Sequence, residues 1–174
     1  LMVGRELSKL YPAKHEPDVD EEIVLSVTNV STGFVKNASF DIRKGEVFGF
    51  SGLIGSGRTE LMEAIVGLRP RLCGEVHVRG KLLTAGHPQD AIDNGLAYMT
   101  KDRKQRGLLL ESRMTPNLTL QSLDRHVRSF YLNPASEAEA MTRATRRFDI
   151  RVRDNRIVAG RMSGGNQQKL LLAK

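Results

Sequence analysis

Apolar and polar residues alternate over short stretches in the N-terminal part of the chain, a pattern typical of β-strands. β-Branched and aromatic residues are concentrated in the same stretches, and glycine and charged residues separate them. Short, wholly apolar runs that are bounded by turn residues are also consistent with buried strands. The pattern therefore predicts strands at 23–30, 38–42, 46–50, 75–78 and 96–99.

Between these strands, two stretches place their apolar residues at helical spacing. Residues 60–66 directly follow a glycine-rich segment, so a strand, a loop and a helix are expected in that order. Residues 88–92 begin with a proline, which suits the first turn of a helix, and Gly95 lies just beyond their end. We therefore expect a helix in each of these two stretches.

The C-terminal part of the chain has a helical pattern. Residues 117–147 suit helices that break around Asn133, and Ser136 with the acidic residues after it is typical of a capped helix start. A last helix is predicted from Ser163 to the final residue, with no stop signal. We therefore expect the chain to be truncated inside this helix.

Three parts of the chain differ in composition. Residues 1–20 carry two prolines, mixed charges and little periodicity, which is typical of a linker. One domain is predicted over 21–174, because 174 residues suffice for a single core. Within it, a helical subdomain is expected at about 115–165.

Composition narrows the classes of function. The single Cys73 cannot form an internal disulfide, which fits a reducing compartment. No apolar run approaches the roughly 20 residues that cross a bilayer, so any membrane association should come through a partner. The net charge of +7 suits an anionic partner, but no aromatic residues interleave with a basic run, which argues against nucleic acid.

The segment from Gly52 to Thr59 has the spacing of a P-loop, G-x-x-x-x-G-K-[ST], with Arg58 at the lysine position. In such a loop, backbone N–H groups and the following helix bind phosphate, and the Thr59 hydroxyl would hold Mg²⁺. Arg58 keeps the charge but has a wide planar head, so we expect nucleotide binding to survive better than hydrolysis. A glycine-rich turn without a ligand remains the alternative.

A second glycine motif, Ser163-Gly164-Gly165, opens the last predicted helix. Its N–H groups and hydroxyl could hold a phosphate from another direction. A simple N-cap at Ser163 would explain the serine, but it would not call for the two glycines that follow.

Taken together, the two motifs resemble those of ABC transporter ATPases, in the variant found in sugar importers. Ser-Gly-Gly-Asn-Gln-Gln at 163–168 resembles the signature motif, and 51–62 resembles the P-loop of the second ATPase half, where arginine is a usual replacement. Residues 101–108 resemble the stretch after the Q-loop strand of that half, and 2–12 resemble the end of a first half with its linker. The implied fold is an α/β P-loop NTPase of ABC ATPase type, with an N-terminal antiparallel β subdomain, a partial RecA-like core and a helical subdomain.

The resemblance also implies a function. The chain would be the second half of a tandem ATPase that drives import of ribose, galactose, xylose or similar sugars, using ATP and Mg²⁺. Its partners would be the first ATPase half of the same polypeptide, transmembrane permease subunits and, indirectly, a sugar-binding protein. It would lie peripherally at the cytoplasmic face of the cell membrane.

Site residues follow from the same resemblance. The Walker B aspartate, the catalytic glutamate and the switch histidine of the family have no counterpart here, and none of His15, His77, His87 and His126 fits the last of these. We therefore expect no catalytic residue in this chain, which alone should be inactive although the full-length protein is an ATPase. Thr59 is the expected Mg²⁺ ligand. The expected nucleotide-binding residues are Gly52, Gly55, Ser56, Gly57, Arg58, Thr59, Glu60, Ser163, Gly164, Gly165 and Gln167.

Two departures from the family pattern bear on the mechanism. Lys101 stands at the Q-loop position, where a cation cannot supply an oxygen to Mg²⁺, unless the residue is a surface lysine and the alignment slips by one. Phe34 is the aromatic residue nearest to an adenine-stacking position, but we expect it in the core. A degenerate, non-hydrolysing scaffold half that supplies its signature motif to the partner site is therefore the main alternative. An unrelated P-loop kinase or GTPase would not need Ser163-Gly164-Gly165.

Overall fold

The computed structural model describes residues 19–174 and contains two compact units, the first ending at Tyr98 and the second beginning at Met99. Each unit has its own hydrophobic core and is described by itself. Apart from its last two residues, the linker predicted at 1–20 lies outside the described residues. No helix in the described range is long and apolar enough to cross a bilayer.

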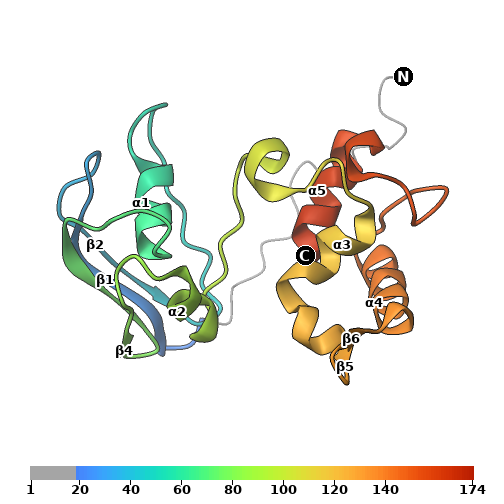
Figure 1. Ribbon diagram of the computed structural model, residues 1–174. Helices are drawn as coiled ribbons and strands as arrows, with labels where there is room; N and C mark the ends of the chain where they lie inside the picture. Colours follow the sequence, from blue (N-terminus) through green and yellow to red (C-terminus); the bar gives the residue numbers. More distant parts are fainter. Residues whose placement is uncertain (1–18) are drawn as a thin grey trace. The chain divides into compact units, whose positions relative to one another are not determined.

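The first unit is built on an antiparallel sheet in the order β2-β1-β3-β4 (Figure 1). Its strands are β1 (Ile23–Ser31), β2 (Ala38–Arg43), β3 (Cys73–Val78) and β4 (Lys81–Leu82). The strands predicted at 23–30, 38–42 and 75–78 are therefore confirmed, while the two-residue β4 was too short to give a periodic signal.

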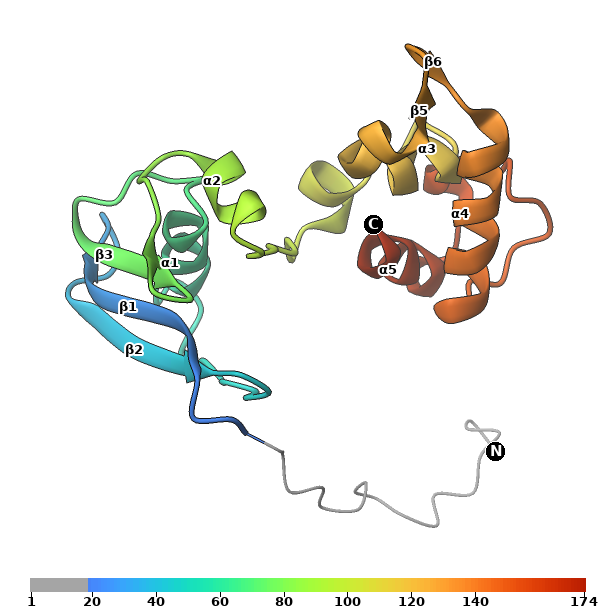
Figure 2. The same ribbon diagram turned by 90° about the horizontal axis from the view of Figure 1, so that it is seen from below.

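Two helices accompany this sheet, α1 (Arg58–Ile65) and α2 (Pro88–Asp93). Both were predicted to within two residues at each end. Figure 2 shows α1 against the sheet, where Leu61 and Ile65 of the helix join Val27 and Val76 of the strands in one buried cluster. Burying these aliphatic side chains holds the helix, and hence the loop in front of it, against β1.

The inner strand β1 is irregular near its C-terminal end. The pairing of β1 shifts after Val27 on the β2 side and after Thr28 on the β3 side, and Asn29 takes the left-handed conformation with φ of 51°. The Asn29 N–H donates to Ser39 Oγ at 2.8 Å. Gly74 of β3 comes so close that a Cβ there would lie 2.5 Å from the Asn29 carbonyl oxygen. Glycine at 74 is therefore required by space.

The strands predicted at 46–50 and 96–99 are wrong, because both segments run without strand pairing. A strand exists only through the partner that accepts its hydrogen bonds, and no residue in the range 19–174 pairs with either segment. Val47 is 94% exposed, while Phe48 stacks on Phe40 of β2 with ring centroids 5.4 Å apart. The segment at 46–50 thus contacts β2 through a side chain and not through strand pairing.

The second unit is mainly helical, with α3 (Met114–Thr119), α4 (Pro134–Arg147) and α5 (Gly164–Ala173). Shorter helical turns are η1 (Arg103–Gly107), η2 (Leu120–His126) and η3 (Ala159–Arg161). α3 contacts both α4 and α5, and its Met114 is fully buried with Met141 and Leu170 from those helices (Figure 2). The helical character predicted for this region is confirmed, as is the last helix.

The helix predicted to begin at Ser136 begins earlier. Asn133 is the cap, and its Oδ1 accepts hydrogen bonds from the N–H groups of Ala135 and Ser136 at 3.1 and 3.3 Å. Pro134 occupies the first helical position, where its missing N–H costs nothing. Before this cap lies an unpredicted hairpin, β5 (Val127–Arg128) and β6 (Tyr131–Leu132), whose strands are too short to show a period.

Candidate nucleotide-binding elements

The predicted P-loop residues lie together at the N-terminus of α1. The loop bends through a turn in which the Ser56 N–H donates to the Leu53 carbonyl at 3.2 Å. Gly57 is the N-cap of α1, with φ of 81°, and its carbonyl accepts the first helical bond from the Leu61 N–H at 2.8 Å. Gly55 is also left-handed, with φ of 85°. Glycine is the residue that adopts these angles without strain.

Space as well as conformation requires glycine in this loop. A Cβ on Gly57 would lie 2.5 Å from Val35 Cγ2 and 3.1 Å from Phe34 Cβ, both in the loop between β1 and β2. A Cβ on Gly52 would lie 2.8 Å from Ser56 Oγ. The backbone of the P-loop therefore rests directly on its neighbours, which fixes where its N–H groups point.

The first turn of α1 offers N–H groups to an anion. The N–H groups of Arg58, Thr59 and Glu60 begin the helix and have no intrahelical acceptor. The Arg58 side chain is exposed and passes near Gly52, since its Nε would lie 3.7 Å from a Cβ there. With the positive end of the helix dipole, these groups suit phosphate. Glu60 is the one acidic side chain in this turn.

Phe34 is not a core residue, and that prediction was wrong. Its side chain is 63% exposed, and the guanidinium of Arg69 lies 5.9 Å from the ring centroid. Arg69 is itself held by Glu63 at 2.8 Å. The loop turns Phe34 outward because Thr32 Oγ1 accepts hydrogen bonds from the N–H groups of Phe34 and Val35, each at 3.1 Å.

The second glycine motif also lies at the start of a helix. Ser163 is the N-cap of α5, and its Oγ accepts a hydrogen bond from the Asn166 N–H at 3.4 Å. The predicted cap is thus present. Gly164 and Gly165 are exposed and provide the first two N–H groups of the helix. Phosphate binding by these three residues stays a prediction.

Gln167 faces the interior of the second unit. It is buried, its Nε2 donates to the Ala159 carbonyl at 3.0 Å, and its Oε1 accepts from Arg103 Nε at 3.3 Å. Direct contact with a nucleotide would require these bonds to break. The sequence indicated Gln167 as a ligand and gave no role to Arg103.

Behind the glycines, α5 is tied to the loop at 149–151. Asn166 pairs with the backbone of Arg151, accepting from its N–H at 3.1 Å and donating to its carbonyl at 2.7 Å. Hydrogen bonds from the side chains of Arg151 and Lys169 hold the pKa of Asp149 below its ordinary value of 3.8. These contacts fix the start of the helix.

The sequence also singled out Lys101 and the histidines. Lys101 is exposed at the start of the second unit. His126 is buried, with Nδ1 at 2.9 Å from Ser136 Oγ, and His77 lies 3.8 Å from Glu75. In the part of the chain that the structure describes, no group of three or more His, Cys, Asp or Glu residues could hold a metal ion.

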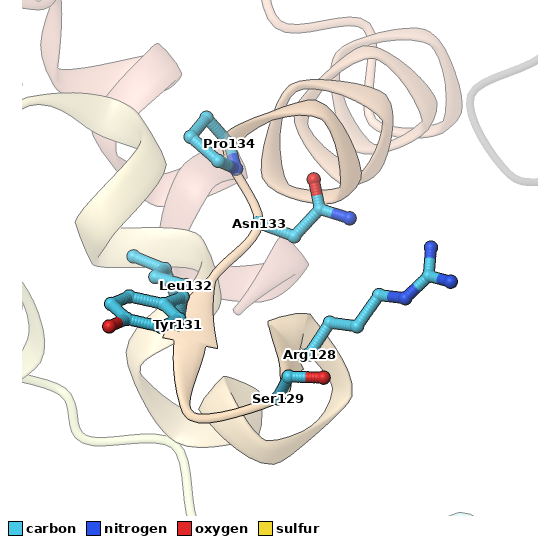
Figure 3. A pocket seen from close by; sticks show the side chains of 6 residues that line it. All are labelled: Arg128, Ser129, Tyr131, Leu132, Asn133 and Pro134. Atoms are coloured by element: carbon cyan, nitrogen blue, oxygen red, sulfur yellow. The ribbon is translucent and has the colours of Figure 1, made fainter.

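Two hollows in the second unit contain none of the predicted ligands. One, of about 350 Å³, lies beside the β5–β6 hairpin, with Tyr131 and Leu132 on one side of the hairpin and Arg128 on the other (Figure 3). The other, of about 850 Å³, is bordered by four arginines: Arg125, Arg143, Arg146 and Arg147. Each glycine motif is therefore treated as a candidate binding element of its own unit.

Curated relatives match the chain over its whole length. A ribose import ATP-binding protein of Burkholderia pseudomallei (strain 1710b), RbsA 2, is 41% identical over 175 residues, covering 100% of this chain and 34% of the relative. RbsA of Lactococcus lactis subsp. cremoris (strain SK11) is 38% identical over 173 residues, covering 99% and 35%. The chain thus spans about a third of the length of these relatives.

Solved structures match the fold. The dimeric bacterial ABC transporter cassette MJ0796 gives a TM-score of 0.69 at 19% identity, covering 86% of this chain and 67% of that one. The ATP-binding cassette MJ1267 gives a TM-score of 0.66 at 19% identity, covering 87% and 63%. The α/β P-loop fold with an antiparallel β subdomain is therefore that of the ABC ATPases. A family model described as ABC transporter matches residues 35–174, and the chain belongs to this family.

Proposed function

We propose that this chain is the second nucleotide-binding half of a tandem ATPase that couples ATP binding and hydrolysis to sugar import. The observation that carries the proposal is the conformation of the P-loop, with Gly57 left-handed and enclosed at the N-cap of α1. Its likeness to ribose import ATP-binding proteins over the whole chain supports the sugar importer, with ribose as the first sugar to test.

At the first motif, ATP would bind through its phosphates. The N–H groups that begin α1 would hold the β- and γ-phosphates, and Arg58 would add a positive charge beside them. Thr59, second in the helix, is the residue that would hold Mg²⁺ through its hydroxyl. When bound, this ion neutralises phosphate charge as the terminal bond breaks.

At the second motif, Ser163, Gly164 and Gly165 would complete the ATP site of the first half of the same polypeptide. Two halves that pair head to tail bring each P-loop opposite the other half's signature motif. Closure around ATP would change the conformation of transmembrane permease subunits. A sugar-binding protein would deliver the sugar to these subunits. The protein would therefore act peripherally at the cytoplasmic face of the membrane.

A non-hydrolysing scaffold half is the second candidate, and two side chains favour it. Arg58 replaces the usual lysine, and Lys101 offers no oxygen to Mg²⁺ at the Q-loop position. In this version the P-loop of the chain binds ATP with slow turnover, and its signature motif serves the partner site.

Calorimetric titration of the chain with ATP and Mg²⁺ tests nucleotide binding. We expect saturable binding that Gly57→Asp abolishes, because a side chain there meets Val35 and its charge repels phosphate. Thr59→Ala should remove the dependence on Mg²⁺. Gly49→Asp is the matched control, since a Cβ at Gly49 meets nothing within 4 Å. Equal binding by the wild type and the Gly57→Asp variant would contradict the proposal.

Turnover by the tandem protein with its permease separates the two candidates. Thr59→Ala disables only the second site. If the second site hydrolyses ATP during transport, both ATP turnover and sugar uptake should fall by about half or more in this variant. If the second half is a scaffold, both rates should be unchanged. Ser163→Arg should stop turnover at the first site in either case, because its side chain would block the start of α5.

A further inference from the structure

Arg103 places a guanidinium group at the N-terminus of α5. The residue begins η1, and its Nε donates to Gln167 Oε1 at 3.3 Å, 64 residues away in the sequence. A Cβ on Gly164 would lie 3.1 Å from Arg103 Nη2 and 3.8 Å from Cζ. The guanidinium therefore lies against the first glycine of the helix, in space that a side chain at 164 would occupy.

The geometry leaves most of the guanidinium donors available. Within residues 19–174, the terminal nitrogens of Arg103 form no hydrogen bond, since only Nε is engaged. The neighbouring carboxylate of Asp102 accepts hydrogen bonds from the N–H groups of Lys104 and Gln105, at 3.1 and 3.0 Å, and so caps η1. Up to four N–H donors on Arg103 thus remain beside the exposed Gly164.

The charge arrangement is unfavourable for the helix by itself. The N-terminus of a helix carries a partial positive charge, so acidic side chains stabilise it and cations destabilise it. The first turn of α5 contains no acidic residue, and the group beside it is a cation. An anion between Arg103 and the N–H groups of Gly164 and Gly165 would convert this repulsion into two attractions.

We propose that Arg103 contacts the terminal phosphates of the nucleotide bound at the signature motif. This role rests on the proposed function and adds Arg103 to the residues that would contact the nucleotide there. The planar guanidinium can donate two parallel hydrogen bonds to phosphate oxygens. Gln167 then acts as a positioning residue, because its buried amide holds Arg103 Nε while Nε2 is fixed by the Ala159 carbonyl.

Inorganic pyrophosphate is the probe, and the backbone N–H signals of the ¹⁵N-labelled chain are the readout. Titration should shift the signals of Gly164 and Gly165 with one affinity and those of Gly52 to Thr59 with another. Arg103→Gln should weaken the affinity at Gly164 and Gly165 about fivefold, as expected for loss of a charged hydrogen bond near solvent. Arg103→Lys keeps the charge but loses the planar pair of donors, so its affinity should fall between those of the wild type and Arg103→Gln.

The P-loop signals are the internal control, because all variants should leave their affinity for pyrophosphate unchanged. Gln167→Met removes the partner of Arg103 and keeps the charge, so its affinity should fall between those of the wild type and Arg103→Gln. Equal affinities in the wild type and Arg103→Gln would overturn the proposal. So would a loss accompanied by shifted α5 signals before pyrophosphate is added, which would assign Arg103 a purely structural role.

The same titration separates the inference from the proposed function. A response confined to the P-loop signals would overturn the role of Arg103 while nucleotide binding stands. No response at either motif would contradict both.

Discussion

Asn117 satisfies both backbone polar groups of Leu109 at once. Its Oδ1 accepts a hydrogen bond from the Leu109 N–H at 2.7 Å, and its Nδ2 donates to the Leu109 carbonyl at 2.9 Å. The same Nδ2 also donates to the Arg113 carbonyl at 3.0 Å, and the side chain is fully buried. Asn117 thus closes the loop that leads into α3.

Asn117→Leu should destabilise the chain by roughly 2 kcal/mol, because the Leu109 N–H loses its partner, whereas the Leu109 carbonyl keeps the Ser112 N–H. Urea unfolding followed by circular dichroism measures the change. Asn155→Leu is the matched control, since Asn155 is exposed. A loss below about 0.5 kcal/mol for Asn117→Leu would show that the loop finds other partners.

Three alanine variants separate strain from crowding in the P-loop. Gly55→Ala forces a left-handed φ in open space and should cost about 1 kcal/mol. Gly57→Ala adds a clash with Val35 and should cost at least about 1 kcal/mol more. Gly49→Ala meets nothing within 4 Å and should stay within about 0.5 kcal/mol of the wild type. Equal costs at 55 and 57 in urea unfolding would rule out the crowding.

Arg58 contributes charge to the first motif. Arg58→Ala should weaken ATP binding about tenfold in calorimetry, because a charged donor beside the phosphates is lost. Arg58→Lys should bind within about threefold of the wild type, since both cations serve phosphate. Arg43→Ala, which removes the same charge from an exposed residue outside the P-loop, is a control for a general charge effect. Undiminished binding by Arg58→Ala would remove Arg58 from the site.

Asp149 should make stability depend on acid pH. Hydrogen bonds from Arg151 and Lys169 lower its pKa in the folded chain below 3.8, so the unfolded chain takes up a proton first. The stabilisation is therefore present above about pH 4 and is lost as the pH falls through the lower folded pKa. Urea midpoints of the wild type and Asp149→Asn should converge as the pH falls below about 4. Glu111→Gln, an exposed carboxylate variant, is the control, and a pH-independent difference would contradict the linkage.

The β5–β6 turn should accept glycine. Phe130 has φ of 70° and its side chain is 100% exposed, so the backbone conformation is strained and no packing offsets it. Phe130→Gly should therefore stabilise the chain by about 0.5 to 1 kcal/mol in urea unfolding. Tyr131→Gly, in the adjacent strand, should destabilise it, and a loss of stability in Phe130→Gly would show that the ring has contacts in solution.

Elements with local signals could be predicted from the sequence, whereas features that depend on distant partners could not. The cap at Ser163 and the glycine turn before α1 are encoded within a few residues, and both are present. The strand predicted at 46–50 has the right composition, but a strand also needs a neighbour, and none of the described residues supplies one. Hydrophobicity alone suggested a core position for Phe34, but the direction of a side chain in a loop follows from hydrogen bonds such as those of Thr32.

The candidate site shows the same division. The glycines of both motifs could be found from spacing, because backbone conformation fixes them locally. The interior position of Gln167 and the placement of Arg103 follow from packing between segments 64 residues apart, which no local pattern records. The only signal for Arg103 in the sequence was that it is a basic residue close to the Q-loop position at Lys101.

The contact between Gly57 and the β1–β2 loop has a mechanical consequence. Val35 and Phe34 lie directly behind the P-loop, with less than a methyl group of free space between them and Gly57. Any shift of the P-loop in that direction when a phosphate arrives must therefore displace the tip of the β1–β2 loop. A spectroscopic label on exposed Lys36 should therefore report nucleotide binding from outside the phosphate site.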